Sequence, residues 1–319
     1  MTVFSRAALA LSTLALLTGA AAAQEWPAKQ PIKVIVPFTA GSSTDIAARV
    51  VFEQVGRQVG QTFVVENRTG AGTTIGSGFV AKSDPDGYTI LVNSSSHAAV
   101  AATYSKLSYN PADDFAGISP LANLPLTVIA PLKYKSMADL VAAGQKGSLN
   151  FGSAGAGSAG HLFLESVRIA GKMNAVHIPF RGTPEGVTEI IAGRIDFYVA
   201  PVLNAVPFVR DGKISALAVG SAKRAASMPE VPTTKEAGLA NAGYEFWVAA
   251  LVPVKTPRPL VERINKEVLA ALKMKAISDR IHTLGGEPMP MSAKEFDAFL
   301  RKEITINQAI VKAAGFKPQ

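Results

Sequence analysis

Short runs rich in β-branched residues alternate with segments of helical periodicity along most of this chain. Near the N-terminus, the β-branched runs occupy residues 32–37, 63–66 and 89–93. The intervening segments, 44–59 and 74–81, have the apolar spacing of helices packed on one side. A strand–helix–strand order of this kind is typical of parallel sheets covered by helices. The pattern therefore predicts an α/β fold.

A second alternating series and a helical tail follow. Strands are predicted at residues 128–130, 149–152, 176–179, 196–200 and 216–220, and helices at 137–143, 159–170 and 185–192. The tail adds a strand at 246–252 and helices at 259–274, 275–284 and 293–314. Because the tail helices lack a sheet of their own, we expect them to cover the first sheet. The prediction is two lobes with a hinged ligand cleft between them: a discontinuous first lobe, residues 24–124 and 244–319, and an inserted second lobe, residues 125–243.

The first 23 residues have the composition of an export signal. One positive charge at Arg6 precedes an Ala/Leu-rich run, and Ala21-Ala22-Ala23 matches the A-x-A cleavage pattern. We expect a signal peptide at residues 1–23, cleaved after about Ala23, and an exported protein. The alternative is an uncleaved anchor, but the apolar run is shorter than the ~20 residues that a membrane helix needs.

Composition excludes several classes of chemistry. The chain has no cysteine, which rules out disulfides, thiolate metal sites, iron–sulfur clusters and cysteine nucleophiles. Its formal charge of +8 is spread thinly, and the densest basic cluster, Lys223-Arg224, has no interleaved aromatic residues. We therefore expect no nucleic-acid partner, no metal and no cofactor, and an attraction for small acids.

Four turns rich in Gly, Ser and Thr follow predicted strands and lead into helices, at residues 38–45, 93–97, 152–161 and 181–185. Helix N-termini offer unpaired N–H groups and a dipole that attract anions. Because parallel strands end at one edge of a sheet, we expect these turns to face the same cleft.

Signals for catalysis are weak. Gly155-Ala-Gly-Ser-Ala-Gly160 matches the dinucleotide fingerprint, and residues 70–76 match a looser variant, but neither is followed by the acidic residue that binds a ribose. The nucleophile elbow GxSxG, the zinc motif HExxH and the phosphate-binding GxxxxGK[ST] are absent from the sequence. We expect a protein that is not an enzyme. An enzyme using a nucleotide cofactor is a remote alternative.

A series of motifs, in order along the chain, resembles one known family. It includes Ile32-Lys-Val-Ile-Val-Pro-Phe38, Val64-Val-Glu-Asn-Arg68, Asp84-Pro-Asp-Gly-Tyr88, Leu149-Asn-Phe-Gly-Ser-Ala154, His177-Ile-Pro-Phe180 and Thr256-Pro-Arg-Pro259. These resemble motifs of the solute-binding proteins of tripartite tricarboxylate transporters, the Bug family, over nearly the whole chain after residue 23. The resemblance implies a two-lobed periplasmic-binding-protein fold, type II-like. It also implies a periplasmic protein, expected to be a monomer, that captures a small carboxylate and delivers it to membrane permease subunits.

By the same resemblance, turns of the two lobes hold the ligand from opposite sides. The candidate ligand-binding residues are Phe38, Thr39, Ser42, Ser43, Thr44, Asp45, Ser95 and Ser96 in the first lobe, and Ala154, Gly157, Ser158, His161, Arg181 and Thr183 in the second. Ser42, Ser43 and Thr44 would supply hydroxyl and N–H donors to one carboxylate. N–H groups around Gly157 would receive the opposite end of the ligand.

Three candidates have a structural role as an open alternative. Asp45 either caps the first loop or accepts a hydrogen bond from a ligand hydroxyl or amine. His161 either supports the second loop or touches the ligand. Arg181 is the one cation that the sequence places to counter an anion, and the alternative is a solvated position at the edge of the lobe.

Two departures from the family pattern bear on the ligand. Residues 38–42 read Phe-Thr-Ala-Gly-Ser where many relatives have Phe-Pro-Pro-Gly-Gly, which predicts a more polar first wall. Ala200-Pro201-Val202 stands where many relatives have an acidic or amide residue, which predicts a less polar second wall. A dicarboxylate is the default expectation, and a ligand with an apolar or aromatic middle stays open. A subunit that senses a ligand for a membrane sensor is the alternative function.

Overall fold

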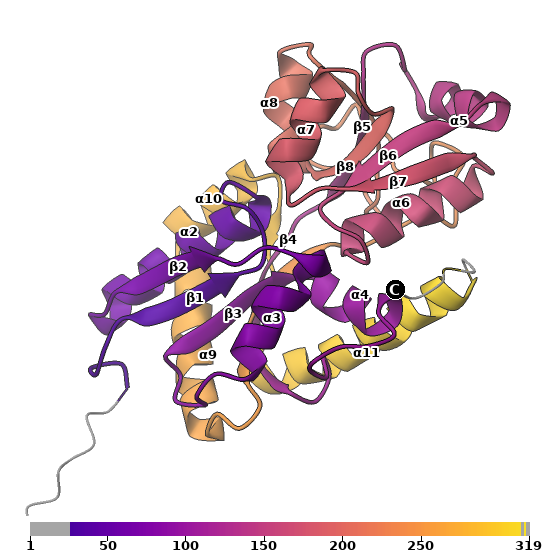
Figure 1. The fold of residues 1–319 in the computed structure, drawn as a ribbon. Helices are drawn as coiled ribbons and strands as arrows, with labels where there is room; N and C mark the ends of the chain where they lie inside the picture. Colours follow the sequence, from indigo (N-terminus) through magenta and orange to yellow (C-terminus); the bar gives the residue numbers. More distant parts are fainter. Residues whose placement is uncertain (1–25, 314–315, 317–319) are drawn as a thin grey trace, which may run out of the picture.

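The computed structural model describes residues 26–313 and 316. In this part of the chain the strands form a six-stranded sheet, in the order β11-β4-β10-β3-β1-β2, and a five-stranded sheet, in the order β7-β6-β8-β5-β9. Figure 1 shows the two sheets as separate layers, each with helices against it. The predicted signal peptide lies outside the described residues.

The first sheet is built from both ends of the chain. Its strands are β1 (Ile32–Val36), β2 (Phe63–Asn67), β3 (Thr89–Ser94), β4 (Phe115–Asn123), β10 (Trp247–Pro253) and β11 (Glu287–Pro288). The helices that follow or cover them are η1 (Ala71–Thr73), α2 (Ser43–Val59), α3 (Thr74–Ala81), α4 (Ser96–Thr103), α9 (Arg258–Lys273), α10 (Lys275–Thr283) and α11 (Ala293–Ala313). Strand β1 pairs in parallel with β2 and β3, whereas β10 runs antiparallel between β3 and β4.

The second sheet is built from the middle of the chain. Its strands are β5 (Leu126–Ala130), β6 (Leu149–Ser153), β7 (Ala175–Pro179), β8 (Phe197–Pro201) and β9 (Ser215–Val219), and its helices are α5 (Met137–Lys146), α6 (Ala159–Ala170), α7 (Thr183–Ile191) and α8 (Val202–Arg210). Strand β6 is parallel to β7 and β8, while β5 is antiparallel to both of its neighbours. The strand–helix–strand pattern indicated parallel units, and β5 and β10 depart from it because they run antiparallel to their neighbours. These two strands follow the segments that cross between the sheets, so they enter from the opposite end.

The C-terminal helices cover the first sheet, as expected (Figure 1). The Asn265 side chain of α9 donates to the carbonyl oxygen of Ile118 at 2.7 Å, and Asp297 of α11 accepts from the N–H of Gly117 at 2.8 Å, so both helices are tied to β4. The fully buried Trp247 packs against Phe296 and Phe299 of α11. Burial of such aromatic side chains stabilises the sheet–helix interface by several kcal/mol per ring, about 3–5 kcal/mol on truncation to Ala.

Five elements were absent from the predicted ranges: η1, β4, α4, α8 and β11. Strand β4 contains Pro120, which cannot donate to a ladder, and its pairing with β10 is irregular on both sides of Ala249 and Ala250. Helix α8 contains Pro207 and directly follows Pro201. Proline and small polar residues are strand and helix breakers in isolation. The surrounding sheet compensates for them here.

Two chain segments cross between the sheets side by side. One leads from β4 to β5, and the other enters β10. The N–H of Leu124 donates to the carbonyl oxygen of Phe246 at 2.8 Å and joins them. Two adjacent crossings of this kind allow a hinge motion between two bodies. The residue boundaries of the lobes, 24–124 with 244–319 and 125–243, stay a prediction.

None of the helices within residues 26–313 is long and apolar enough to cross a lipid bilayer.

Candidate functional site

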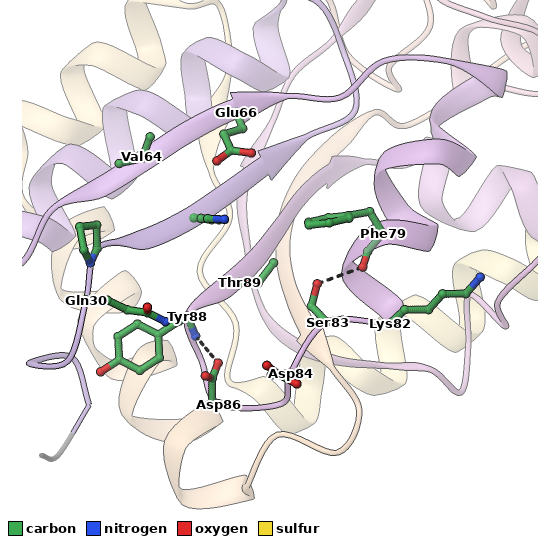
Figure 2. A pocket seen from close by; sticks show the side chains of 12 residues that line it. Gln30, Val64, Glu66, Phe79, Lys82, Ser83, Asp84, Asp86, Tyr88 and Thr89 are labelled. Atoms are coloured by element: carbon green, nitrogen blue, oxygen red, sulfur yellow. Dashed lines mark hydrogen bonds between the residues drawn. The ribbon is translucent and has the colours of Figure 1, made fainter. Parts of the chain in front are cut away.

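A hollow of about 680 Å³ lies on the first sheet alone, over β1, β2, β3 and α3 (Figure 2). Its lining carries both signs of charge, with Lys33 and Lys82 against Glu66, Asp84 and Asp86. None of the predicted ligand-binding residues lines it. Because only one sheet contributes, no second body can close over a ligand there, and it is not our candidate site.

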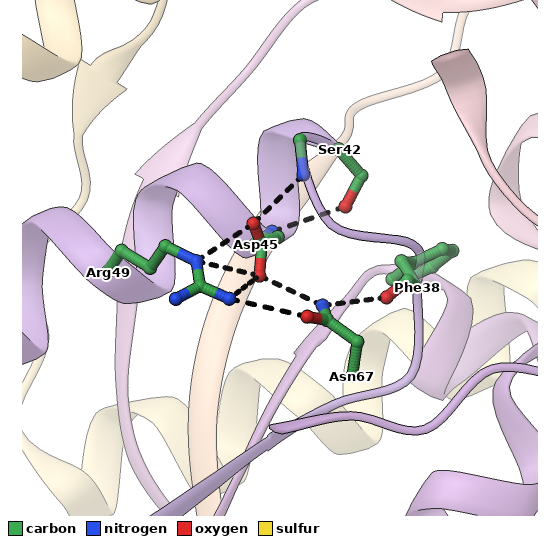
Figure 3. A network of polar contacts seen from close by, with 6 residues as sticks. Phe38, Ser42, Asp45, Arg49 and Asn67 are labelled. Atoms are coloured by element: carbon green, nitrogen blue, oxygen red, sulfur yellow. Dashed lines mark hydrogen bonds and ion pairs between the residues drawn. The ribbon is translucent and has the colours of Figure 1, made fainter. Parts of the chain in front are cut away.

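The first wall of the candidate site is the loop between β1 and α2. Ser42 caps α2 by accepting the N–H of Asp45 at 3.3 Å. Figure 3 shows how Asp45 holds this loop: its carboxylate accepts from the N–H of Gly41 at 3.0 Å, from Nε of Arg49 at 3.1 and 3.0 Å, and from Nδ2 of Asn67 at 2.9 Å. Burial raises the pKa of Asp45, but these hydrogen bonds outweigh burial and leave the pKa below its ordinary value of 3.8. The structure therefore shows Asp45 as the loop's cap.

Removing this carboxylate should destabilise the protein. In Asp45→Ala, the N–H of Gly41, the half-buried amide of Asn67 and the guanidinium of Arg49 lose a charged acceptor. A hydrogen bond to a charged group contributes about 1.5–3 kcal/mol when buried and less when exposed. We expect the free energy of unfolding, measured in urea, to fall by about 2–4 kcal/mol. Asp211→Ala is the control, because its ion pair with Lys213 is exposed and contributes about 0–1 kcal/mol. Equal losses in the two variants would contradict this reading of the network.

The second wall is the glycine-rich loop between β6 and α6. Ser158 caps α6 by accepting the N–H of His161 at 3.3 Å, and Nδ1 of His161 accepts the N–H of Gly157 at 3.0 Å. The His161 ring stacks on that of His177, with centroids 3.7 Å apart, and Nε2 of His177 lies 2.8 Å from Oγ of Ser153. Burial lowers the pKa of His161 to about 3 and that of His177 to about 4, so both rings are neutral supports of this loop near pH 7.

The second wall is in direct contact with helix α4 of the first sheet's side. The hydroxyl of Thr103 donates to the carbonyl oxygen of Gly157 at 3.0 Å, and that of Tyr104 donates to the carbonyl oxygen of Ala156 at 3.1 Å. The N–H of Ala159 donates to Oγ of Ser96 at 3.1 Å. These bonds join α4 and its C-cap Tyr104 to the loop before α6 and to the first residue of α6, so the structure represents a closed arrangement of the two bodies.

A small cavity of about 30 Å³, partly open to solvent, remains where the two sides meet. Eight of the predicted residues line it: Phe38, Ser42, Ser43, Thr44, Ser96, Ala154, Ser158 and Thr183. This volume holds about one water molecule. A larger ligand therefore requires the two bodies to separate and close again around it.

Five further residues line the cavity that sequence reasoning did not select: Leu126, Gly160, Val199, Pro201 and Phe246. Four of them are apolar, and their strand patterns indicate only burial. Pro201 was noted as a departure from the family pattern, and Gly160 lies in the predicted turn at residues 152–161. The others come together only through the pairing of β5 with β8 and the crossing at Phe246.

Six predicted residues lie outside the lining of the cavity: Thr39, Asp45, Ser95, Gly157, His161 and Arg181. Gly157 was expected to offer its N–H to a ligand, but the N–H is bound to His161. Arg181 is exposed, and its N–H donates to Oε2 of Glu185. In this closed form, the contacts of His161 fit a support for the second loop, and those of Asp45 fit a cap of the first loop.

The elements of a hydrolase do not assemble here. Ser153 lies within hydrogen-bond distance of His177, but its hydroxyl is fully buried and donates to the carbonyl oxygen of Gly155 at 3.0 Å. A nucleophile needs access to a substrate and a base that accepts its proton. Among the described residues, no group of three or more His, Asp or Glu side chains could hold a metal ion.

Comparison with known proteins agrees with this geometry. Residues 47–316 match the model of a family described as the tripartite tricarboxylate transporter family receptor. The chain is 31% identical to Protein BugT of Bordetella pertussis over 302 residues, 92% of each chain. It resembles the structure of the periplasmic binding protein BugD with a TM-score of 0.87 and 30% identity, over 91% of this chain and 99% of that one. It also resembles Rpa4515 of R. palustris, solved with adipate, with a TM-score of 0.88 and 29% identity, over 92% and 100% of the two chains.

The fold is that of a two-domain periplasmic binding protein, with a sheet and its helices on each side of a closed cleft. The chain belongs to the tripartite tricarboxylate transporter receptor family, which includes the Bug proteins. The resemblance seen in its sequence motifs is thereby confirmed.

Proposed function

We propose that this protein binds a small carboxylate between its two lobes in the periplasm and delivers it to a tripartite tricarboxylate-type membrane transporter. The observation that carries the proposal is the cavity between the sheets, which is lined by the N-terminal turns of α2 and α6. Helix N-terminal turns attract anions. A relative of the same fold was solved with the dicarboxylate adipate.

The donor set is sufficient for useful affinity without a cationic side chain. A partly buried helix terminus contributes up to ~2 kcal/mol, and each charge-assisted hydrogen bond about 1.5–3 kcal/mol. A few such contacts reach the −8 kcal/mol or so of micromolar binding. Because the contacts come from both sheets, they are complete only after closure, and the closed form is the state that we expect the permease to recognise.

Export and the absence of catalysis belong to the same proposal. The A-x-A pattern ending at Ala23 supports secretion and cleavage near that residue. Family membership in a receptor group supports a role in binding, not in chemical conversion.

Thermal denaturation with a panel of mono- and dicarboxylates tests the proposal. A ligand present at 100 times its Kd should stabilise the protein by about 2.7 kcal/mol and raise Tm. Thr44→Val should weaken this effect, because it removes a buried hydroxyl from the cavity wall. The control is Thr188→Val, whose hydroxyl bonds within α7 and lies on an exposed surface. If no acid in the panel raises Tm, the proposed function is wrong.

A further inference from the structure

We infer that the ligand of this cavity is an acid with a single carboxylate and an apolar body, not a dicarboxylate. The inference rests on the proposed function and refines it. It follows from an asymmetry between the two walls: the first presents free helix-start donors, while the second is mainly apolar and its helix-start donors are largely in use.

The first wall can receive one carboxylate. In the first turn of a helix the leading N–H groups have no intrahelical partner. In α2, the N–H of Asp45 is capped by Ser42 and that of Ile46 bonds to the carbonyl oxygen of Ser42. The N–H groups of Ser43 and Thr44 stand before them in the same turn, and both residues line the cavity with their hydroxyl-bearing side chains.

The corresponding donors of α6 are taken by partners within the protein. The N–H of Gly157 is bound to His161, and that of Ser158 to the carbonyl oxygen of Gly155. The N–H of Ala159 is bound to Ser96, and that of His161 to Ser158. In the first turn of α6, the N–H of Gly160 has no such partner among the described residues, and Gly160 lines the cavity.

Helix α7 adds little. Its cap is Gly182, which has no side chain to offer, and Pro184 in its first turn has no N–H. Thr183, the first residue of α7, lines the cavity with one hydroxyl and one N–H that has no intrahelical partner. The cation that was expected to help, Arg181, is exposed and lies outside the lining.

The remainder of the second wall is apolar. Val199 and Pro201 of β8, with Leu126 of β5, line the cavity, and Phe38 and Phe246 close it from the first sheet's side. None of the described lining residues carries a formal charge or an amide side chain. A second carboxylate here would face Val199, Pro201 and Leu126, and its donors would be limited to the Gly160 N–H, the Ser158 hydroxyl and the hydroxyl and N–H of Thr183. Loss of its hydration against the apolar side chains is unfavourable. A methylene chain or an aromatic ring would instead bury apolar surface there.

Matched pairs of acids test the inference in the intact mature protein. Isothermal titration would compare hexanoate with adipate, pentanoate with glutarate, and benzoate with terephthalate. In the two aliphatic pairs a carboxylate replaces the terminal methyl at constant carbon number, and in the aromatic pair it replaces the para hydrogen. We expect the monocarboxylate of at least one pair to bind, and its dicarboxylate partner to bind at least about tenfold more weakly.

A designed change of the second wall gives an independent readout. Val199→Thr adds one hydroxyl at nearly constant volume beside Gly160. It should reduce the ratio of the Kd values of the dicarboxylate and the monocarboxylate in the pair that binds. Val219→Thr, a fully buried strand position outside the cavity, is the control for the cost of burying a hydroxyl, and it should leave this ratio unchanged.

The outcomes separate the two proposals. Tighter binding of the dicarboxylates, with Val199→Thr neutral, would overturn the inference and leave the proposed function standing. Binding of neither member of any pair would overturn both. Preference for a monocarboxylate that narrows in Val199→Thr, and not in Val219→Thr, would support the inference.

Discussion

Replacing Gly72 with alanine should weaken ligand binding and ligand-induced stabilisation while the protein still folds. Gly72 belongs to η1 on the first sheet's side, and a Cβ built on it would overlap the carbonyl oxygen of Ala156 on the second. It would also lie 2.9 Å from the hydroxyl of Tyr104, which donates to that same carbonyl. The two bodies would be held apart where they now touch. We expect affinity for the acid to fall by at least about tenfold, measured by titration calorimetry.

The matched control for this variant is Gly193→Ala. Both glycines have a left-handed backbone, with φ of +58° at Gly72 and +68° at Gly193, so alanine costs each about 1–2 kcal/mol. A Cβ at Gly193 would meet no atom within 4 Å. Loss of binding in Gly72→Ala alone therefore reports the blocked closure. Wild-type affinity in Gly72→Ala would show that binding does not need this contact between the walls.

Mild acid should destabilise the protein through three buried histidines. Burial lowers the pKa of His97 to about 4, of His161 to about 3 and of His177 to about 4, from an ordinary value of 6.5. The folded state therefore binds fewer protons than the unfolded state below pH 6.5, and stability is lost as pH falls from there. At pH 5, which is 1.5 units below 6.5, each histidine costs about 2 kcal/mol relative to pH 7.

Between pH 7 and pH 5, the histidines account for most of the expected change in the free energy of unfolding. Asp45, whose pKa is lowered, loses its contribution only below its unfolded value of 3.8. Glu303 acts in the opposite direction, because burial raises its pKa above 4.5, and its protonation in the folded state partly offsets the loss. Near His161, Glu165 lies 3.8 Å from Nε2, and Arg168 pairs with Glu165.

Urea unfolding at pH 7 and pH 5 measures this effect. His161→Gln and His177→Gln should each reduce the difference between the two pH values by about 2 kcal/mol, whatever their stability at pH 7. An unchanged difference in the double variant would rule out these two rings as the source of the acid sensitivity.

The local sequence pattern was sufficient to predict most of the helices and strands. The helices at 74–81 and 159–170 have the predicted bounds, and the strands at 32–37, 63–66 and 89–93 differ from β1, β2 and β3 by one residue each. These segments combine clear periodicity with a capping or turn residue at their ends. Strand β4 has neither, because Gly117 and Pro120 interrupt it, and its conformation depends on β10 and α9 beside it.

Some residues of the candidate site were likewise predictable from local sequence, and others were not. Ser42 and Ser158 were predictable, because a helix N-cap has a strong residue preference. Val199, Leu126 and Phe246 were not, since an apolar residue has the same local signature in a core as in a cavity wall. The use of Gly157 by His161 depends on a ring four residues further along the helix. It is visible only once that helix is formed.

The sequence by itself determined the family, the α/β class and the turns at which helices begin, because these depend on local periodicity, capping preferences and ordered motifs. Only the tertiary structure decided which of the helix-start donors remain available in the closed cleft and which apolar side chains face them. That balance arises from contacts between residues far apart in the chain, such as Ser96 with Ala159 and Tyr104 with Ala156, which no local pattern records.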